Sequence, residues 1–243
     1  MPKEQLSTKL KPDEIERLKK LLEDMNCISS GLSDHEIFRA KIRDSQIIVY
    51  KSGVVVYHQD VMPIISSSLL EDEAVEVGSD EAGKGEIEGP IVVAAVVLDG
   101  NARRELRTMG LMESKSIPKK RLFIMRNLIK SKCISLDLEV IEPEEFLSSW
   151  KRGNLNDLLV EWHKKAIIKV TKEVRVDRII IDAFDRTKIL SAVEPIAKEI
   201  GASLVVEERA DENYPTVAAA SILARATRDD LIKEGHIERK WRL

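Results

Sequence analysis

The chain contains the stretch Gly78-Ser79-Asp80-Glu81-Ala82-Gly83-Lys84-Gly85-Glu86, which follows a short apolar segment. Two adjacent carboxylates at the end of a strand are suitable ligands for hard divalent cations. Backbone N–H groups beside glycine can approach a phosphate closely, because glycine has no side chain in the way. Metal ligands and a phosphate-binding turn in one stretch indicate phosphoester chemistry.

The same stretch matches most of the nucleotide-binding P-loop pattern. That pattern needs Ser or Thr after the lysine, where this chain has Gly85, and a helix directly afterwards. Instead, an apolar and β-branched run at residues 91–98 predicts a buried strand. The two acidic residues inside the turn would also repel a triphosphate. These features argue against a P-loop.

Composition limits the possible partners and compartment. The 243 residues are enough for two modest domains or one large one, and 43% hydrophobic with 33% charged residues is typical of a globular protein. The 39 basic and 42 acidic residues nearly balance, so any nucleic-acid site must be local. Cys27 and Cys133 are isolated, the N-terminus has no signal-peptide core, and the run at 91–98 is too short to span a bilayer. The sequence predicts a cytoplasmic protein with no membrane partner.

The first 72 residues have a pattern of their own. Pro12 and two acidic residues open a helix in which apolar residues recur at helical spacing. Three strand-like segments follow at residues 36–43, 46–51 and 54–58. Small and acidic residues at 66–73 then indicate a linker. We therefore expect an N-terminal domain of residues 1–72, built from a helix and an antiparallel sheet, and a second domain of residues 73–243.

In the second domain, predicted strands alternate with predicted helices. The strands are expected at residues 75–79, 91–98, 133–140, 178–182 and 203–207. The helices are expected at residues 118–132, 142–150, 155–174, 190–200 and 215–232. This order predicts an α/β fold with a mixed sheet and helices on its faces.

Two further carboxylates come at or after the ends of predicted strands. Asp182 ends a buried strand, and Asp211 follows the next strand. If these strands are neighbours, both carboxylates converge on Asp80 and Glu81, and the four would suit two Mg²⁺ or Mn²⁺ ions. A lone aspartate after a strand is, however, usually a helix cap or a turn residue. Spacing alone leaves both interpretations open.

Longer motifs resemble the type-2 ribonucleases H. The stretch from Gly78 to Gly85, followed by Gly89-Pro90-Ile91-Val92-Val93-Ala94-Ala95, is similar to the opening of that family. Three later elements follow in the family's order, and they are Glu113-Ser114-Lys115, Ile181-Asp182 and the run from Arg209 to Asp229. Glu113 replaces the aspartate usual in the first of these elements.

Two segments resemble the ribonuclease HIII branch. Residues 154–163 are similar to that branch's asparagine-rich helix start, and residues 38–41 with 50–53 are similar to its TATA-binding-protein-like N-terminal domain. The resemblance implies a ribonuclease H-like mixed sheet flanked by helices, preceded by a small α+β domain that binds substrate. His163, beside Trp162 on a predicted helix, is more typical of packing than of catalysis, and its role stays open.

The resemblance also implies an activity, the cleavage of the RNA strand of RNA–DNA hybrids by two-metal-ion hydrolysis, which leaves 5′-phosphate and 3′-hydroxyl ends. The implied metal ligands and catalytic residues are Asp80, Glu81, Asp182 and Asp211, with two Mg²⁺ or Mn²⁺ ions. The implied substrate-binding residues are Gly83, Lys84, Gly85, Ser114, Lys115, Arg39 and Lys41. Gly83, Lys84 and Gly85 would contact the 2′-hydroxyl groups that distinguish RNA from DNA. We expect the enzyme to be a monomer.

The C-terminal end departs from the family. After Asp229 the chain runs only to Leu243, and Tyr214 is its last tyrosine, so the residue that helps the HII branch recognise a lone ribonucleotide has no counterpart. The catalytic domain is thus expected to be short at its C-terminus and to prefer stretches of RNA over a single ribonucleotide. A hybrid-binding protein with little catalysis is the alternative function.

Overall fold

The computed structural model describes residues 4–86, 89–112, 118–150 and 155–234. The chain forms two compact units. The first comprises residues 1–72 and 103–113, and the second comprises residues 73–102 and 114–243. None of the helices described is long and apolar enough to cross a lipid bilayer.

The first unit is built on an antiparallel sheet with the strand order β1-β5-β4-β3-β2. Its strands are β1 (Gln5–Lys9), β2 (Ile28–Ser30), β3 (Glu36–Ile42), β4 (Ser45–Tyr50) and β5 (Val54–His58). Helix α1 (Pro12–Asp24) buries Leu18 and Leu22 in the same core cluster as Phe38 and Ala40 of β3. The helix and the last three strands were predicted from the sequence, because their apolar residues repeat with the period of each element.

Strands β1 and β2 and the helical segment after β5 were not predicted. Strand β1 is mostly polar and β2 is only three residues long, so neither has a clear apolar alternation. The serine-rich segment predicted as the start of a linker instead forms helix α2 (Met62–Ser68) after the short η1 (Gln59–Val61). The linker prediction was wrong for residues 66–68 because Ile65 and Leu69 pack into the core, and tertiary burial outweighs the low helix propensity of serine. Residues 69–75 form neither helix nor strand.

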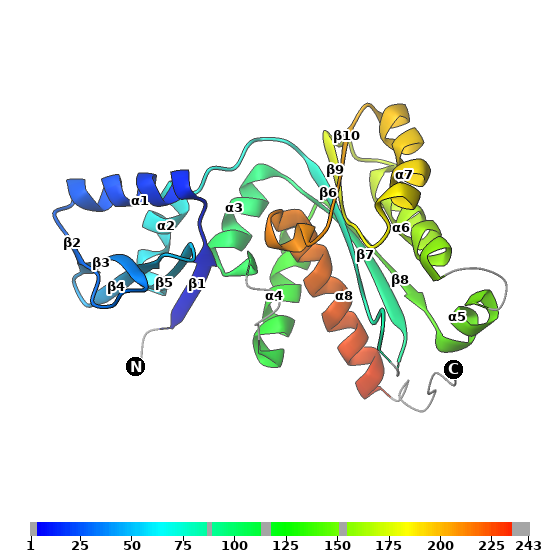
Figure 1. Ribbon diagram of the computed structural model, residues 1–243, viewed down its shortest axis with the longest axis horizontal. Helices are drawn as coiled ribbons and strands as arrows, with labels where there is room; N and C mark the ends of the chain where they lie inside the picture. Colours follow the sequence, from blue (N-terminus) through cyan, green and yellow to red (C-terminus); the bar gives the residue numbers. More distant parts are fainter. Residues whose placement is uncertain (1–3, 87–88, 113–117, 151–154, 235–243) are drawn as a thin grey trace. The chain divides into compact units, whose positions relative to one another are not determined.

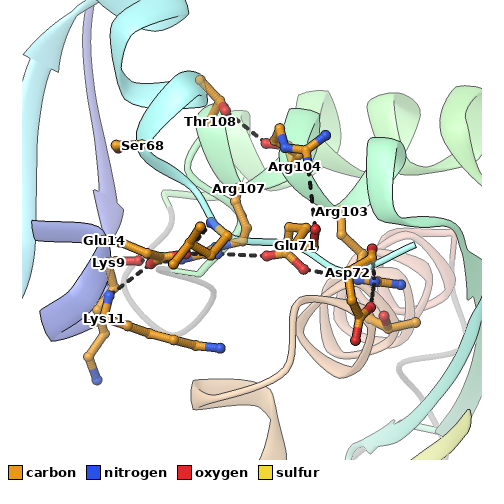
Figure 2. Close-up of polar contacts among 12 residues, drawn as sticks. Lys9, Lys11, Glu14, Ser68, Glu71, Asp72, Arg103, Arg104, Arg107 and Thr108 are labelled. Atoms are coloured by element: carbon orange, nitrogen blue, oxygen red, sulfur yellow. Dashed lines mark hydrogen bonds and ion pairs between the residues drawn. The ribbon is translucent and has the colours of Figure 1, made fainter. Parts of the chain in front are cut away.

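A buried ionic network joins parts of the first unit that are far apart in sequence (Figure 2). Arg107 lies on α3 (Gly100–Thr108) and its Nη1 and Nη2 donate to the two carboxylate oxygens of Glu14, each at 2.7 Å. Its Nη1 also contacts Glu71 Oε1 at 2.6 Å, and Arg103 Nε donates to Glu71 Oε2 at 3.1 Å. Arg103 and Arg107 are both almost fully buried. Helix α3 was not predicted from the sequence because arginine occupies two of its buried positions, which interrupts the apolar pattern.

The second unit is built on a mixed sheet with the strand order β10-β9-β6-β7-β8. Its strands are β6 (Glu76–Ala82), β7 (Ile91–Leu98), β8 (Ser135–Ile141), β9 (Arg178–Asp182) and β10 (Ser203–Glu207). Strands β6, β9 and β10 are parallel, whereas β7 runs antiparallel to both of its neighbours. All eight residues of β7 are buried, as its unbroken apolar sequence predicts for a strand covered on both faces.

Helices cover both faces of this sheet, with α4 and α8 on one side and α6 and α7 on the other (Figure 1). The helices are α4 (Lys119–Lys132), α5 (Pro143–Trp150), α6 (Leu155–Thr171), α7 (Arg186–Ile200) and α8 (Pro215–Lys233). The first turn of α8 approaches β6 closely, because the backbone of Thr216 and Val217 lies against Gly78, and the small residues 218–221 that follow are all buried. The predicted mixed α/β fold is thereby confirmed.

Candidate active site

The sheet of the second unit brings acidic residues to one edge. Because β6, β9 and β10 are parallel, their C-terminal ends lie at the same edge. Ser79 of β6 pairs with Ile181 of β9, so that Asp80 and Asp182 come next along the two neighbouring strands. The short helix η3 (Ala210–Glu212) follows β10 and carries Asp211.

These residues line one cavity of about 430 Å³. Its lining residues are Asp80, Glu81, Gly83, Lys84, Asp182, Asp211, Ser221 and Arg225. The structure thus brings together all four carboxylates singled out in the sequence and two residues of the glycine turn. Gly85, the last residue of that turn motif, is not part of the lining, and a side chain there would meet nothing within 4 Å.

Burial, together with the crowding of carboxylates, determines the electrostatics of the cavity. Burial raises the pKa of Asp80 well above its usual range, and the charges of Glu81 and Asp182 raise it further. Hydrogen bonds from the Ser221 hydroxyl and the Glu81 amide act in the opposite direction. Burial likewise raises the pKa of Asp182, although the backbone amide of Ala210 opposes this. A site that holds several carboxylates at this cost in charge repulsion is suited to a cation.

Asp182 also shapes the segment that carries Asp211. Its Oδ1 accepts a hydrogen bond of 3.2 Å from the Ala210 amide at the start of η3. The preceding residue, Arg209, adopts the left-handed conformation with φ 57°, which is uncommon for a residue other than glycine. The chain therefore turns sharply after β10, and this turn places Asp211 at the cavity instead of continuing the strand.

Glu81 is held by a buried histidine. His163 of α6 is fully buried, with its Nε2 3.1 Å from Glu81 Oε2 and its Nδ1 2.8 Å from the Ser79 hydroxyl. The Ser79 hydroxyl also donates to the Ala94 carbonyl at 3.0 Å. The ring of His163 also lies 5.5 Å from that of Phe184. His163, whose role the sequence left open, therefore packs behind Glu81 and contacts it directly.

Lys84 is the half-buried cation of the glycine turn. Its ammonium group lies 4.0 Å from the centre of the Phe184 ring, which is a cation–π distance. Burial lowers the pKa of Lys84, while the charges of Glu81, Asp185 and Asp182 counteract this. Phe184 thus contacts both Lys84 and His163.

The four carboxylates that line the cavity are of the right chemical type to bind divalent metal ions. Carboxylate oxygens are the ligands that Mg²⁺ and Mn²⁺ prefer, and four such groups line the cavity. Across the described ranges, however, no three His, Cys, Asp or Glu side chains converge closely enough to bind a single ion as they stand. One oxygen of each of two carboxylates is engaged within the protein, Glu81 Oε2 with His163 and Asp182 Oδ1 with the Ala210 amide.

Other predicted substrate contacts lie elsewhere. Arg39 and Lys41 are on β3 of the first unit, on the strand face opposite the core. Arg39 already pairs with Glu36, at 2.5 Å from Nε and 2.6 Å from Nη2, whereas Lys41 is exposed. Ser114 and Lys115 lie outside the described residues.

Sequence reasoning did not select Ser221, Arg225 or His163 as site residues. Ser221 and Arg225 are four positions apart on α8 and therefore share a helix face, which was a usable signal once that helix was predicted. His163 had no such signal, because its partner Glu81 is 82 residues away in the chain.

Comparisons with known proteins agree with this geometry. The family described as Ribonuclease HII matches residues 77–241. A ribonuclease HII of Methanococcus maripaludis strain C7 is 32% identical over 179 residues, covering 73% of this chain and 74% of that protein. The family match contains every residue that lines the cavity.

Solved structures extend the likeness to the fold. Bst-RNase HIII in complex with Mn²⁺ has a TM-score of 0.61 at 20% identity, over 95% of this chain and 82% of that one. The ribonuclease HII in a PCNA complex from Archaeoglobus fulgidus has a TM-score of 0.56 at 29% identity, over 65% of this chain and 74% of that one.

The mixed sheet with carboxylates at one edge, together with the family match, defines an enzyme of the ribonuclease H class, an endonuclease that hydrolyses phosphodiester bonds. The chain belongs to the ribonuclease HII family, in the type-2 branch of that class. Dependence on divalent metal ions is general in this family, and the family acts on RNA–DNA hybrids.

Proposed function

We propose that this enzyme cleaves the RNA strand of RNA–DNA hybrids with two Mg²⁺ or Mn²⁺ ions held by Asp80, Glu81, Asp182 and Asp211. The observation that carries the proposal is that these carboxylates and the glycine turn line one cavity. When bound, the ions would activate a water molecule for attack on phosphorus and stabilise the leaving 3′ oxygen. The products would carry 5′-phosphate and 3′-hydroxyl ends.

The chain's own residues would position the substrate. Gly83 has φ 101°, a backbone conformation that glycine adopts readily, and a Cβ there would clash with Arg228 Nε and the Pro90 carbonyl, so the shape of this turn depends on glycine. We propose that the backbone from Gly83 to Gly85 contacts the 2′-hydroxyl groups of the RNA strand. Lys84 and Arg225, the two cationic side chains of the cavity lining, would contact phosphate oxygens.

We further propose that the N-terminal part of the first unit, residues 1–72, binds the backbone of the hybrid through the sheet face that carries Arg39 and Lys41. The fold shared with Bst-RNase HIII over 95% of the chain supports a unit of this kind. Lys41 is the stronger candidate, because Arg39 is already paired with Glu36. Placement in the HIII branch, with preference for stretches of RNA over a single ribonucleotide, is part of the same proposal.

Cleavage of a labelled RNA–DNA hybrid in Mg²⁺ or Mn²⁺ tests the catalytic proposal, with Asp80→Asn as the inactive control. Cleavage by the parent alone supports it, whereas binding without cleavage by either protein would support the hybrid-binding alternative. A duplex with a single ribonucleotide should be cleaved more slowly than one with a stretch of RNA. Equal rates would refute the proposed preference.

The salt dependence of hybrid binding tests the first unit. Lys41→Gln should reduce the slope of log affinity against log salt by about 0.7–0.9, the value expected for one lost phosphate contact. Lys20→Gln is the matched control, because Lys20 is also exposed but lies on α1, which covers the core side of the sheet. An unchanged slope for Lys41→Gln would exclude this residue from the backbone contacts.

A further inference from the structure

The turn between β6 and β7 has a backbone that only glycine adopts readily. Gly83, Gly85 and Gly89 have φ values of 101°, 84° and 84°, all in the left-handed region. Within the described part of the turn, the amide of Glu86 donates to the Gly83 carbonyl at 3.1 Å. A turn that is rich in glycine has many alternative conformations, so a defined shape requires contacts from outside the turn.

Arg228 of α8 supplies such contacts. Its side chain is almost fully buried, its Nε donates to the Pro90 carbonyl at 2.9 Å, and its Nη1 lies 2.7 Å from Glu86 Oε2. A Cβ placed on Gly83 would be only 2.6 Å from Arg228 Nε, and one on Gly89 would be 3.3 Å from Nη2. The guanidinium group therefore packs against glycines near both ends of the turn.

The same helix contributes to the catalytic cavity. Ser221, Arg225 and Arg228 are spaced by four and three residues, which places them along one face of α8. Ser221 hydrogen-bonds Asp80, and Ser221 and Arg225 line the cavity, whereas Arg228 lies against the turn. A rigid helix thus connects the carboxylate edge of the sheet to the glycine turn.

We propose that Arg228 is a positioning residue that fixes the conformation of the turn around Gly83 and thereby sets the enzyme's preference for RNA over DNA. This inference rests on the proposed function of the turn, the contact with 2′-hydroxyl groups. The buried bond to the Pro90 carbonyl provides most of the restraint, because Glu86 is exposed and its ion pair is weakened by solvent. Arginine suits the role because its planar group donates in several fixed directions at once.

Hydrogen exchange of the free enzyme tests the positioning without nucleic acid. In Arg228→Gln the amide of Glu86, bonded across the turn, should exchange at least about tenfold faster, because local opening of the turn becomes easier. Amides of the β6–β7 ladder should keep their rates. Asp230→Asn is the matched control, because it removes the ion pairs with Arg126 and Lys233 from the same helix without contacting the turn. Unchanged exchange at Glu86 in Arg228→Gln would overturn the proposal.

A conservative variant guards against misfolding. If Arg228→Gln melts well below the parent, Arg228→Lys is the test, because a lysine keeps the charge but lacks the rigid planar fork of donors that contacts the Pro90 carbonyl and Glu86 together. Arg228→Lys should fold and still accelerate exchange at Glu86. Parental exchange in a folded Arg228→Lys would overturn the proposal.

Binding measurements in the non-cleaving Asp80→Asn background test the effect on RNA preference. We compare the affinity for an RNA–DNA hybrid with the affinity for a DNA duplex of the same sequence. The ratio of the first affinity to the second should fall at least about fivefold in Arg228→Gln, and the salt dependence of binding should not change. An equal loss on both duplexes with a shallower salt dependence would show a direct phosphate contact and refute the proposal. A third outcome is faster exchange at Glu86 in Arg228→Gln together with equal affinity of Asp80→Asn alone for the hybrid and the DNA duplex. This outcome would refute the proposed contact of the turn with 2′-hydroxyl groups but would support the positioning of the turn by Arg228.

Discussion

Replacing Gly78 even by alanine should strongly destabilise the second unit, because the backbones of β6 and α8 are in direct contact there. A Cβ on Gly78 would lie 2.3 Å from the carbonyl carbon and oxygen of Thr216 and 2.5 Å from the Val217 nitrogen. Ordinary contacts of this kind are 3.4–4 Å long, so the strand and the helix would have to separate by about 1 Å. Neither partner is the flexible end of a side chain, so the overlap cannot be relieved by a rotamer change.

The expected loss follows from this overlap. Gly78→Ala should reduce the free energy of unfolding by at least about 3 kcal/mol, the upper part of the range for overpacked cores. For a unit of this size, that corresponds to a melting temperature about 6–12 °C lower. The folded fraction should also lose activity by about 100-fold, because a shift of α8 by 1 Å displaces Ser221 and Arg225 from the carboxylates.

Urea unfolding followed by circular dichroism measures this loss, with Gly201→Ala as the control. Gly201 has φ 75° and an open environment, so alanine there should lose only about 1 kcal/mol from the left-handed conformation. If Gly78→Ala is no less stable than Gly201→Ala, then α8 does not press on β6 and the packing argument is refuted.

Three other outcomes are expected. Arg107→Met should destabilise the first unit by about 3–5 kcal/mol, because it leaves Glu14 buried without its counter-ion, and the addition of Glu14→Gln should recover part of the loss in thermal melting. Burial alone would raise the pKa of Glu14, but its bonds to Arg107 and to the amides of Leu70 and Lys11 outweigh burial and lower this pKa. The stabilisation from Glu14 should therefore be fully present above the usual carboxylate pKa and be lost as the pH falls below that range. The difference between the urea midpoints at neutral pH and at about pH 3 should be smaller in Glu14→Gln than in the parent. Mn²⁺ at about 100 times its dissociation constant should stabilise the parent by about 2.7 kcal/mol but Asp80→Asn much less, and equal shifts in melting temperature would exclude Asp80 as a ligand.

Much of the second unit could be predicted from the sequence. The apolar run of β7, the strand that ends in Asp182 and the alanine-rich start of α8 all have patterns that depend on the residues alone. The boundaries were accurate to a few residues, since β8 begins at Ser135 and α7 at Arg186, two residues later and four residues earlier than expected. Short strands and a helix that buries arginine were missed because their burial depends on distant partners.

Within the site, the sequence determines the types of residue that are available, and the tertiary structure determines which of them pack together. The sequence determined which carboxylates and glycines are available, because metal ligands and left-handed turns require particular side chains or none. Only the tertiary structure showed that Glu81 contacts His163 and that Arg228 packs against Gly83. It also showed that a side chain at Gly78 would overlap the backbone of α8. Each of these contacts joins residues more than 80 positions apart, and such contacts depend on how strands and helices pack together and not on local pattern.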